Sequence, residues 1–297
     1  MKKIFLLLCF IATTYASAYQ NLTVIINSGP GGLFDQTVRE LQSQLSAELG
    51  YPIIVDYRPG AKSKLAIQEL ITHTANNHLA VMLTQISFLI EEENKNIVPF
   101  SFVGTPTEFL ATKNTVTIED IQYRCNSNRI INYGTTGTGS PAHIFVVVFD
   151  KECANPMQHI PYKGIVPAVT DLLGGQIDLV VATMPPLKER VLSNNAKLLC
   201  TIVPNKSVLF ADLPACSSKP IYKNIDTGEI YFYSSVAADQ NEIKRITQAL
   251  DKIYATEKFK NFIKSNDISQ PIFDTPLDTH YKNNWIKLNQ IITNITH

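Results

Sequence analysis

Two glycine-rich turns are the segments of this sequence best suited to bind a negatively charged group. They span 28–32 (Ser-Gly-Pro-Gly-Gly) and 134–139 (Gly-Thr-Thr-Gly-Thr-Gly), and a predicted helix follows each. The first N–H groups of a helix lack partners and lie at the positive end of its dipole. The dipole contributes only about 0.3–1 kcal/mol when exposed, so hydrogen bonds worth roughly 1.5–3 kcal/mol each must supply most of the affinity. We predict that the turns hold a carboxylate; the alternative is that they are ordinary glycine turns of an α/β protein.

Other chemistries fit the sequence poorly. Ser140 and His143 are three residues apart on one predicted helix, but Ala142 stands where a G-x-S-x-G nucleophile elbow needs its second glycine. The 134–139 turn lacks the G-x-G-x-x-G spacing of a dinucleotide site, and P-loop and H-E-x-x-H motifs are absent. The six histidines have no metal-ligand spacing. We therefore expect no enzyme activity, cofactor or metal, and interpret His143 as a helix-face residue with a local hydrogen bond.

The first 18 residues have the order of a cleavable export signal. Met1-Lys2-Lys3 precedes a mostly apolar run from 4 to 15, and Ala16-Ser17-Ala18 follows. The run is shorter than the roughly 20 residues that a membrane-spanning helix needs. Without residues 1–18 the chain has 24 basic and 26 acidic residues, a net charge of −2. This balance gives no basic face for nucleic acid, and we predict a protein exported to the periplasm.

Four cysteines remain after the predicted signal: Cys125, Cys153, Cys200 and Cys216. They form neither a CxxC pair nor a zinc-like spacing. In an oxidising compartment an even number favours two disulfides, and we predict the local pairs Cys125–Cys153 and Cys200–Cys216. The other two pairings, and four reduced thiols, remain open alternatives.

Apolar β-branched runs alternate with helical spacing along most of the chain. The pattern begins before the first glycine turn, restarts before the second, and predicts two α/β lobes with parallel strands covered on both faces. Ser140 is predicted as the N-cap of the helix after the second turn, with Pro141 at its first position. The predicted strands are 22–26, 52–56, 79–84, 129–133 and 178–182, and the predicted helices are 38–49, 65–72, 141–149, 166–173, 242–254 and 282–292.

Several motifs occur in the order found in one protein family. They are the P-G-G-x-x-D turn at 30–35, the G-x-P-x-x-V-D-x-R-P-G-A segment at 50–61, the second turn at 133–143, and the segments 161–164 (P-Y-K-G), 167–168 and 171–178. Together they make the chain resemble the substrate-binding proteins of tripartite tricarboxylate transporters, the Bug receptors. The resemblance extends over nearly the whole chain after the signal.

The resemblance implies a two-lobed periplasmic-binding-protein fold of type II, or Venus-flytrap architecture, with mixed, mostly parallel sheets. Lobe 1 would comprise residues 19–112 and 233–297, and lobe 2 residues 113–232, with crossings near 109–114 and 231–235. A monomer of this kind would capture a small carboxylate for uptake by a membrane permease. The alternative is a carboxylate sensor or scavenger that signals to a partner protein.

The resemblance also implies a set of ligand-binding residues. Asp35 would orient the first turn through backbone hydrogen bonds, because two negative charges repel. Where the family usually has R-P-G-A-G-G, this chain has lysines at positions 62 and 64; they are either solvated, or one faces the cleft and selects a more acidic ligand. The expected ligand-binding residues are Gly31, Gly32, Phe34, Asp35, Thr84, Thr135, Thr138, Gly139, Ser140, Tyr162 and Thr183.

Overall fold

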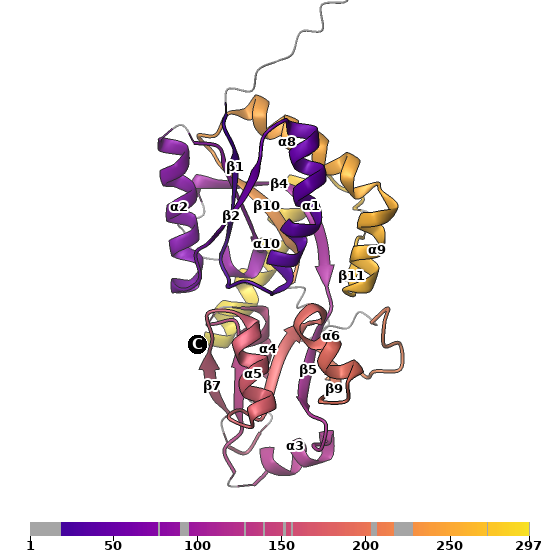
Figure 1. Ribbon diagram of the computed structural model, residues 1–297. Helices are drawn as coiled ribbons and strands as arrows, with labels where there is room; N and C mark the ends of the chain where they lie inside the picture. The colour runs from indigo at the N-terminus through magenta and orange to yellow at the C-terminus, as the bar shows by residue number, and fades with distance from the viewer. Residues whose placement is uncertain are drawn as a thin grey trace, which may run out of the picture.

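The computed structural model describes residues 19–76, 78–89, 95–127, 129–138, 140–150, 153–155, 157–202, 207–216, 228–271 and 273–296. The predicted signal at 1–18 and Gly139 lie outside these residues. The described strands form two mixed sheets, each covered by helices on both faces, and Figure 1 shows them as two lobes, one above the other. The prediction of a two-lobed α/β fold is confirmed.

The sheet of the first lobe has six strands in the order β11-β4-β10-β3-β1-β2. β1 pairs in parallel with β2 and β3, whereas β10 and β11 form antiparallel pairs. The strands are β1 (Leu22–Ile26), β2 (Ile53–Tyr57), β3 (Ala80–Gln85), β4 (Ile97–Pro106), β10 (Ile230–Ser235) and β11 (Ile268–Ser269). The helices are α1 (Leu33–Leu49), α2 (Lys64–Ala75), α8 (Gln240–Tyr254), α9 (Glu257–Ser265) and α10 (Leu277–Thr296), with short 3₁₀ turns η1 (Ala61–Ser63) and η2 (Ile86–Leu89).

The sheet of the second lobe has five strands in the order β7-β6-β8-β5-β9. β6 pairs in parallel with β7 and β8, and β5 pairs antiparallel with β8 and β9. The strands are β5 (Glu108–Lys113), β6 (Asn132–Thr135), β7 (Gln158–Pro161), β8 (Leu179–Thr183) and β9 (Ala196–Thr201). The helices are α3 (Ile118–Cys125), α4 (Pro141–Asp150), α5 (Ile165–Gly174) and α6 (Met184–Leu192).

Alternating residues of the central strands contribute to two cores per lobe. Leu22, Val24 and Ile26 of β1 pack with the apolar sides of α1, α8 and α9, whereas Ile25 packs with α2 and α10. In the second lobe Leu179 packs with α3 and α4, whereas Val180 packs with α5 and α6. Burial on both faces explains why these strands have continuous apolar sequences.

The chain changes sheets earlier than the predicted crossing near 109–114. β4 ends at Pro106 in the first sheet, and β5 begins at Glu108 in the second, so only Thr107 separates them. The return occurs before Ile230, because all of β10 pairs within the first sheet. The connecting strands β5 and β10 run antiparallel to their neighbours, so antiparallel pairing is more extensive than expected.

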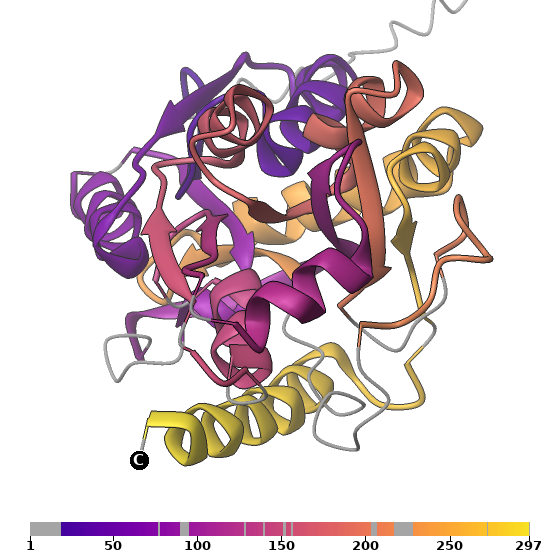
Figure 2. The same cartoon turned by 90° about the horizontal axis from the view of Figure 1, so that it is seen from below.

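The last helix links the two lobes. α10 packs with the first lobe through Leu288 and contacts α4 of the second. Figure 2, seen from below, shows this helix, in yellow, along one side of the molecule, and Figure 1 places its end beside the lower lobe. In the described part of the chain, the helices fall short of the length and apolar character that crossing a bilayer requires.

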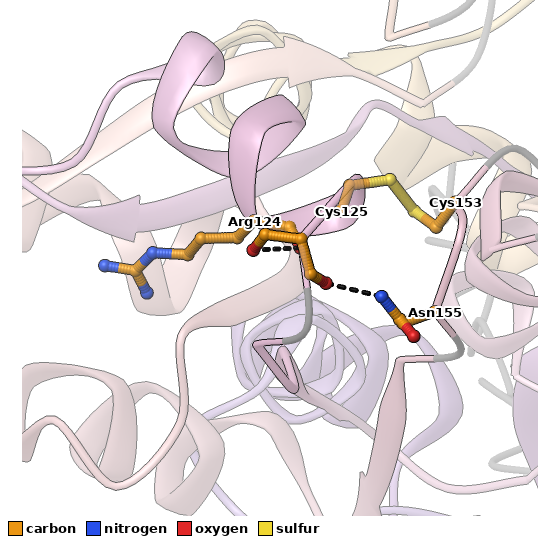
Figure 3. Close-up of a disulfide and its surroundings, with 5 residues drawn as sticks. Arg124, Cys125, Cys153 and Asn155 are labelled. Carbon is orange, nitrogen blue, oxygen red and sulfur yellow. Dashed lines mark hydrogen bonds between the residues drawn. A yellow bond between two sulfur atoms is a disulfide. The ribbon is translucent and has the colours of Figure 1, made fainter.

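Both predicted disulfides are confirmed, and both lie in the second lobe. Cys125 at the end of α3 is bonded to Cys153, and the backbone N–H of Ala154 donates to the Cys125 carbonyl at 3.0 Å. Figure 3 shows this bridge with Arg124 pointing away from it. The second bridge joins Cys200 of β9 to Cys216.

Candidate functional site

A cavity of about 50 Å³ lies between the lobes. A single water needs roughly 10–15 Å³ by a comparable measure, so the cavity has room for a few waters or part of a small solute. The first lobe lines it with Asn27, Ser28, Gly32, Leu33, Phe34 and Gln85, and the second with Glu108, Thr136, Ala142, Ile165, Val181, Ala182 and Thr183.

Four helices begin at this cavity. Gly32 and Thr183, both in its lining, are the N-cap residues of α1 and α6. Ala142 and Ile165, also in the lining, belong to the first turns of α4 and α5. Their N-terminal N–H groups and positive dipole ends make the surroundings of the cavity favourable for an anion.

Asp35 fixes the first-lobe turn. This residue is 4% exposed, and its carboxylate accepts a hydrogen bond from the Gly31 N–H at 2.8 Å and one from the Tyr57 hydroxyl at 2.6 Å. Arg39 forms an ion pair with it at 2.8 Å. Gly31 has φ +83°, which a side chain would strain. The carboxylate of Asp35 is thus engaged in holding the turn.

Thr135 and Ser140 fix the second-lobe turn. The Gly137 N–H donates to Thr135 Oγ1 at 3.1 Å, and the His143 N–H donates to Ser140 Oγ at 3.1 Å. Ser140 therefore caps α4 as predicted. His159 Nε2 lies 2.7 Å from Thr135 Oγ1, so the ring supports the same turn.

His143 and His159 form a tilted pair behind this turn, with ring centroids 4.4 Å apart. Burial, together with the smaller effect of the neighbouring His143, lowers the pKa of His159 to about 4. Burial also lowers the pKa of His143, as does the positive charge of Lys62 from the first lobe. Lys62 thus lies within electrostatic range of the second lobe, but both Lys62 and Lys64 are exposed and neither belongs to the cavity lining.

Glu108 is the ionisable residue of the lining. It is the first residue of β5, opposite Thr183 of β8, and only 6% exposed. Burial raises its pKa to about 7, an effect that a hydrogen bond from Gln85 opposes. Gln85 Nε2 donates to Glu108 Oε1 at 3.4 Å and to the Gly228 carbonyl at 3.3 Å. These contacts join the end of β3 to both crossings of the chain.

Three of the predicted ligand-binding residues, Gly32, Phe34 and Thr183, line the cavity. Gly31, Asp35, Thr135 and Ser140 shape the adjoining turns, and Thr138 is exposed. Thr84 is buried within β3 opposite Tyr231. Tyr162 donates to Asp171 at 2.7 Å, and burial, reinforced by that carboxylate, raises its pKa to about 12.

Sequence reasoning did not select Asn27, Gln85 or Glu108, and it included Ser28 and Thr136 only as members of the two glycine-rich turns. Asn27 and Gln85 directly follow or end buried parallel strands, a position that could have identified them. Glu108 precedes a buried apolar run, where an unpaired acid is unusual. In the described part of the chain, no three His, Cys, Asp or Glu side chains gather as metal ligands would.

Several solved structures share this architecture. The periplasmic binding protein BugD has a TM-score of 0.79 and 17% identity, covering 93% of this chain and 97% of that one. MatC from Rhodopseudomonas palustris, solved with bound malate, has a TM-score of 0.78 and 13% identity, covering 92% of this chain and 98% of that one. The two sheets, the double crossing and the cavity between the lobes therefore define a solute-binding-protein fold.

The chain belongs to the tripartite tricarboxylate transporter family of receptors, whose family model matches residues 37–293. Protein BugT of Bordetella pertussis is 28% identical over 217 residues. That match covers 68% of this chain and 66% of BugT. The resemblance inferred from the sequence motifs is confirmed.

Proposed function

We propose that the protein is an exported, monomeric receptor that captures a small carboxylate-bearing solute between its lobes and delivers it to a membrane permease. The observation that carries this proposal is the cavity at which helices from both lobes begin. MatC with malate, and a related R. palustris structure with adipate, provide support from proteins of the same fold.

Capture without chemistry follows from the composition of the lining. Its side chains are apolar, amide or hydroxyl groups apart from Glu108. The two histidines behind the second turn are absent from that lining. We therefore expect purified protein to bind its ligand and release it unchanged.

The signal and the lobe division belong to the same proposal. Residues 1–18 would be removed on export, so that the periplasmic protein begins at Tyr19. The first lobe would then comprise the chain before Thr107 and after the return near Gly228, as the two sheets suggest. Intact mass of the protein recovered from a periplasmic extract tests the cleavage site.

Titration calorimetry with mono-, di-, tri- and amino-carboxylates tests the binding proposal. We expect at least one acid to bind with a dissociation constant in the micromolar range or below. Gly32→Ala should weaken binding of that acid at least tenfold, because the added methyl would occupy space in the cavity lining. The fold should be preserved, since the methyl would meet Ile165 at an ordinary 3.5 Å. Gly174→Ala, whose methyl meets only Gln176 at 3.9 Å, is the matched control. The proposal fails if no acid binds.

A further inference from the structure

The cavity lining contains an acidic side chain, which does not suit a ligand whose only charged group is a carboxylate. Glu108 is the only ionisable side chain among the described lining residues. A carboxylate ligand beside an ionised Glu108 would place two negative charges in one enclosed space. Like charges repel strongly where water is excluded. The helix N-termini attract an anion, and at a pH where Glu108 is ionised a positive group on the ligand would balance its charge.

Two acceptor oxygens in the lining residues lack donors in the described part of the chain. One is Glu108 Oε2 from the second lobe, and the other is Asn27 Oδ1 from the first. Asn27 uses its amide nitrogen to donate to Ser63 Oγ at 2.6 Å, which leaves the carbonyl oxygen available. Buried acceptors without donors are uncommon in folded proteins and call for an explanation.

An ammonium group matches this arrangement better than other ligand groups. It carries one positive charge and three N–H donors, which are enough for Glu108 and Asn27, and both of these residues line the same cavity. A hydroxyl offers one donor and no charge, and it would leave Glu108 uncompensated. A second carboxylate would add a further negative charge beside Glu108.

We propose that the ligand is a small amino acid or related aminocarboxylate, whose carboxylate lies at the helix N-termini and whose ammonium group is bound by Glu108 and Asn27. This inference rests on the proposed receptor function. Glu108 is then the residue that determines specificity for the ammonium group.

Matched pairs of acids at pH 8 test the proposal by calorimetry. Aspartate and succinate differ only by the amine, as do glutamate and glutarate, and alanine and propionate. In the wild-type protein we expect the amine-bearing member of at least one pair to bind at least 100-fold more tightly. Glu108→Gln should reduce that ratio below tenfold, since the amide keeps the shape but not the charge.

Glu242→Gln provides the matched control. Glu242 is a buried glutamate of the first lobe that pairs with Tyr51 and Arg245 and is absent from the cavity lining. Glu242→Gln should leave the ratio of the two affinities unchanged. Circular dichroism would test whether each variant is folded. Asn27→Ala should weaken the amine-bearing ligand without strengthening its amine-free partner.

The outcomes separate this inference from the receptor function. If succinate, glutarate or propionate binds as tightly as its amine-bearing partner, or if Glu108→Gln keeps the full ratio, the aminocarboxylate assignment is overturned while the receptor function stands. If neither member of any pair binds and the wider acid panel is also silent, the receptor function itself is overturned.

Discussion

The burial of Glu108 has a measurable effect on the ligand-free protein. Its pKa of about 7 lies above the ordinary 4.5, so between these values the unfolded chain releases a proton that the folded protein keeps. The ionisation of Glu108 therefore destabilises the folded state as the pH rises. Each pKa unit is worth about 1.4 kcal/mol, so the difference between about 7 and 4.5 lowers the free energy of unfolding by about 3 kcal/mol above pH 7.

We expect Glu108→Gln to remove this pH-dependent loss. Relative to the variant, the ligand-free wild-type protein should lose about 3 kcal/mol of unfolding free energy between pH 4.5 and pH 8. Urea unfolding at a series of pH values measures the difference, and other titrating groups cancel because both proteins share them. Parallel stability curves for the two proteins would contradict the raised pKa of Glu108.

The site residues that the sequence predicted are those fixed by local backbone requirements. Gly32 and Ser140 could be identified because a glycine turn and an N-cap have local signatures. The contact between Glu108 and Gln85 could not be predicted, because the two residues are 23 positions apart and meet only where strands of the two sheets come together. Contacts between elements distant in sequence leave no periodic signal in either segment.

At the scale of elements, the disulfide between Cys125 and Cys153 should stabilise the second lobe. It closes a loop with a sequence separation of 28, for which the chain-entropy model gives about 3–4 kcal/mol. The double variant Cys125→Ala, Cys153→Ala should therefore unfold at lower urea concentration, with that loss in free energy.

Ligand binding provides the control for this prediction. The bridge joins the end of α3 to a loop of the second lobe, and neither cysteine belongs to the cavity lining. Affinity measured well below the unfolding transition should therefore remain within about twofold of the wild type. An unchanged urea midpoint would show that the bridge does not constrain the unfolded chain.

Most elements of regular pattern were predictable, and their boundaries were less so. The strand predicted at 129–133 is β6 at Asn132–Thr135, because Arg129 and Ile130 are exposed and precede the pairing region. The first helix begins at Leu33, five residues before the predicted 38. β5 and β10 were not predicted as strands, since tertiary pairing defines these crossing segments more than their own sequence does.

At the scale of the whole molecule, the lobes touch through their backbones. The Gly29 N–H donates to the Lys163 carbonyl at 2.9 Å, directly beside Gly164. A Cβ atom at Gly164 would lie 3.1 Å from Gly29 N and 3.4 Å from its Cα. These atoms are backbone, so a side chain at Gly164 would separate the lobes.

We expect Gly164→Ala to favour a more open form. Ligand affinity should fall at least tenfold, because closure must then overcome the added contact, while urea stability should change little since Gly164 has an extended φ of 168°. Small-angle X-ray scattering with saturating ligand should give a larger radius of gyration than for the wild type. Gly174→Ala again serves as control, and equal radii and affinities would contradict the predicted role of this contact.

The position of β10 between β3 and β4 governs the order in which the protein can assemble during translation. When β4 leaves the ribosome its partner has not yet been synthesised, and residues 107–229 must follow first. At about 5–20 residues per second this takes on the order of ten seconds. Throughout that interval the nascent first lobe lacks the strand between β3 and β4, so its sheet is incomplete. A chaperone or translocase would therefore bind a polypeptide that has not yet completed its fold.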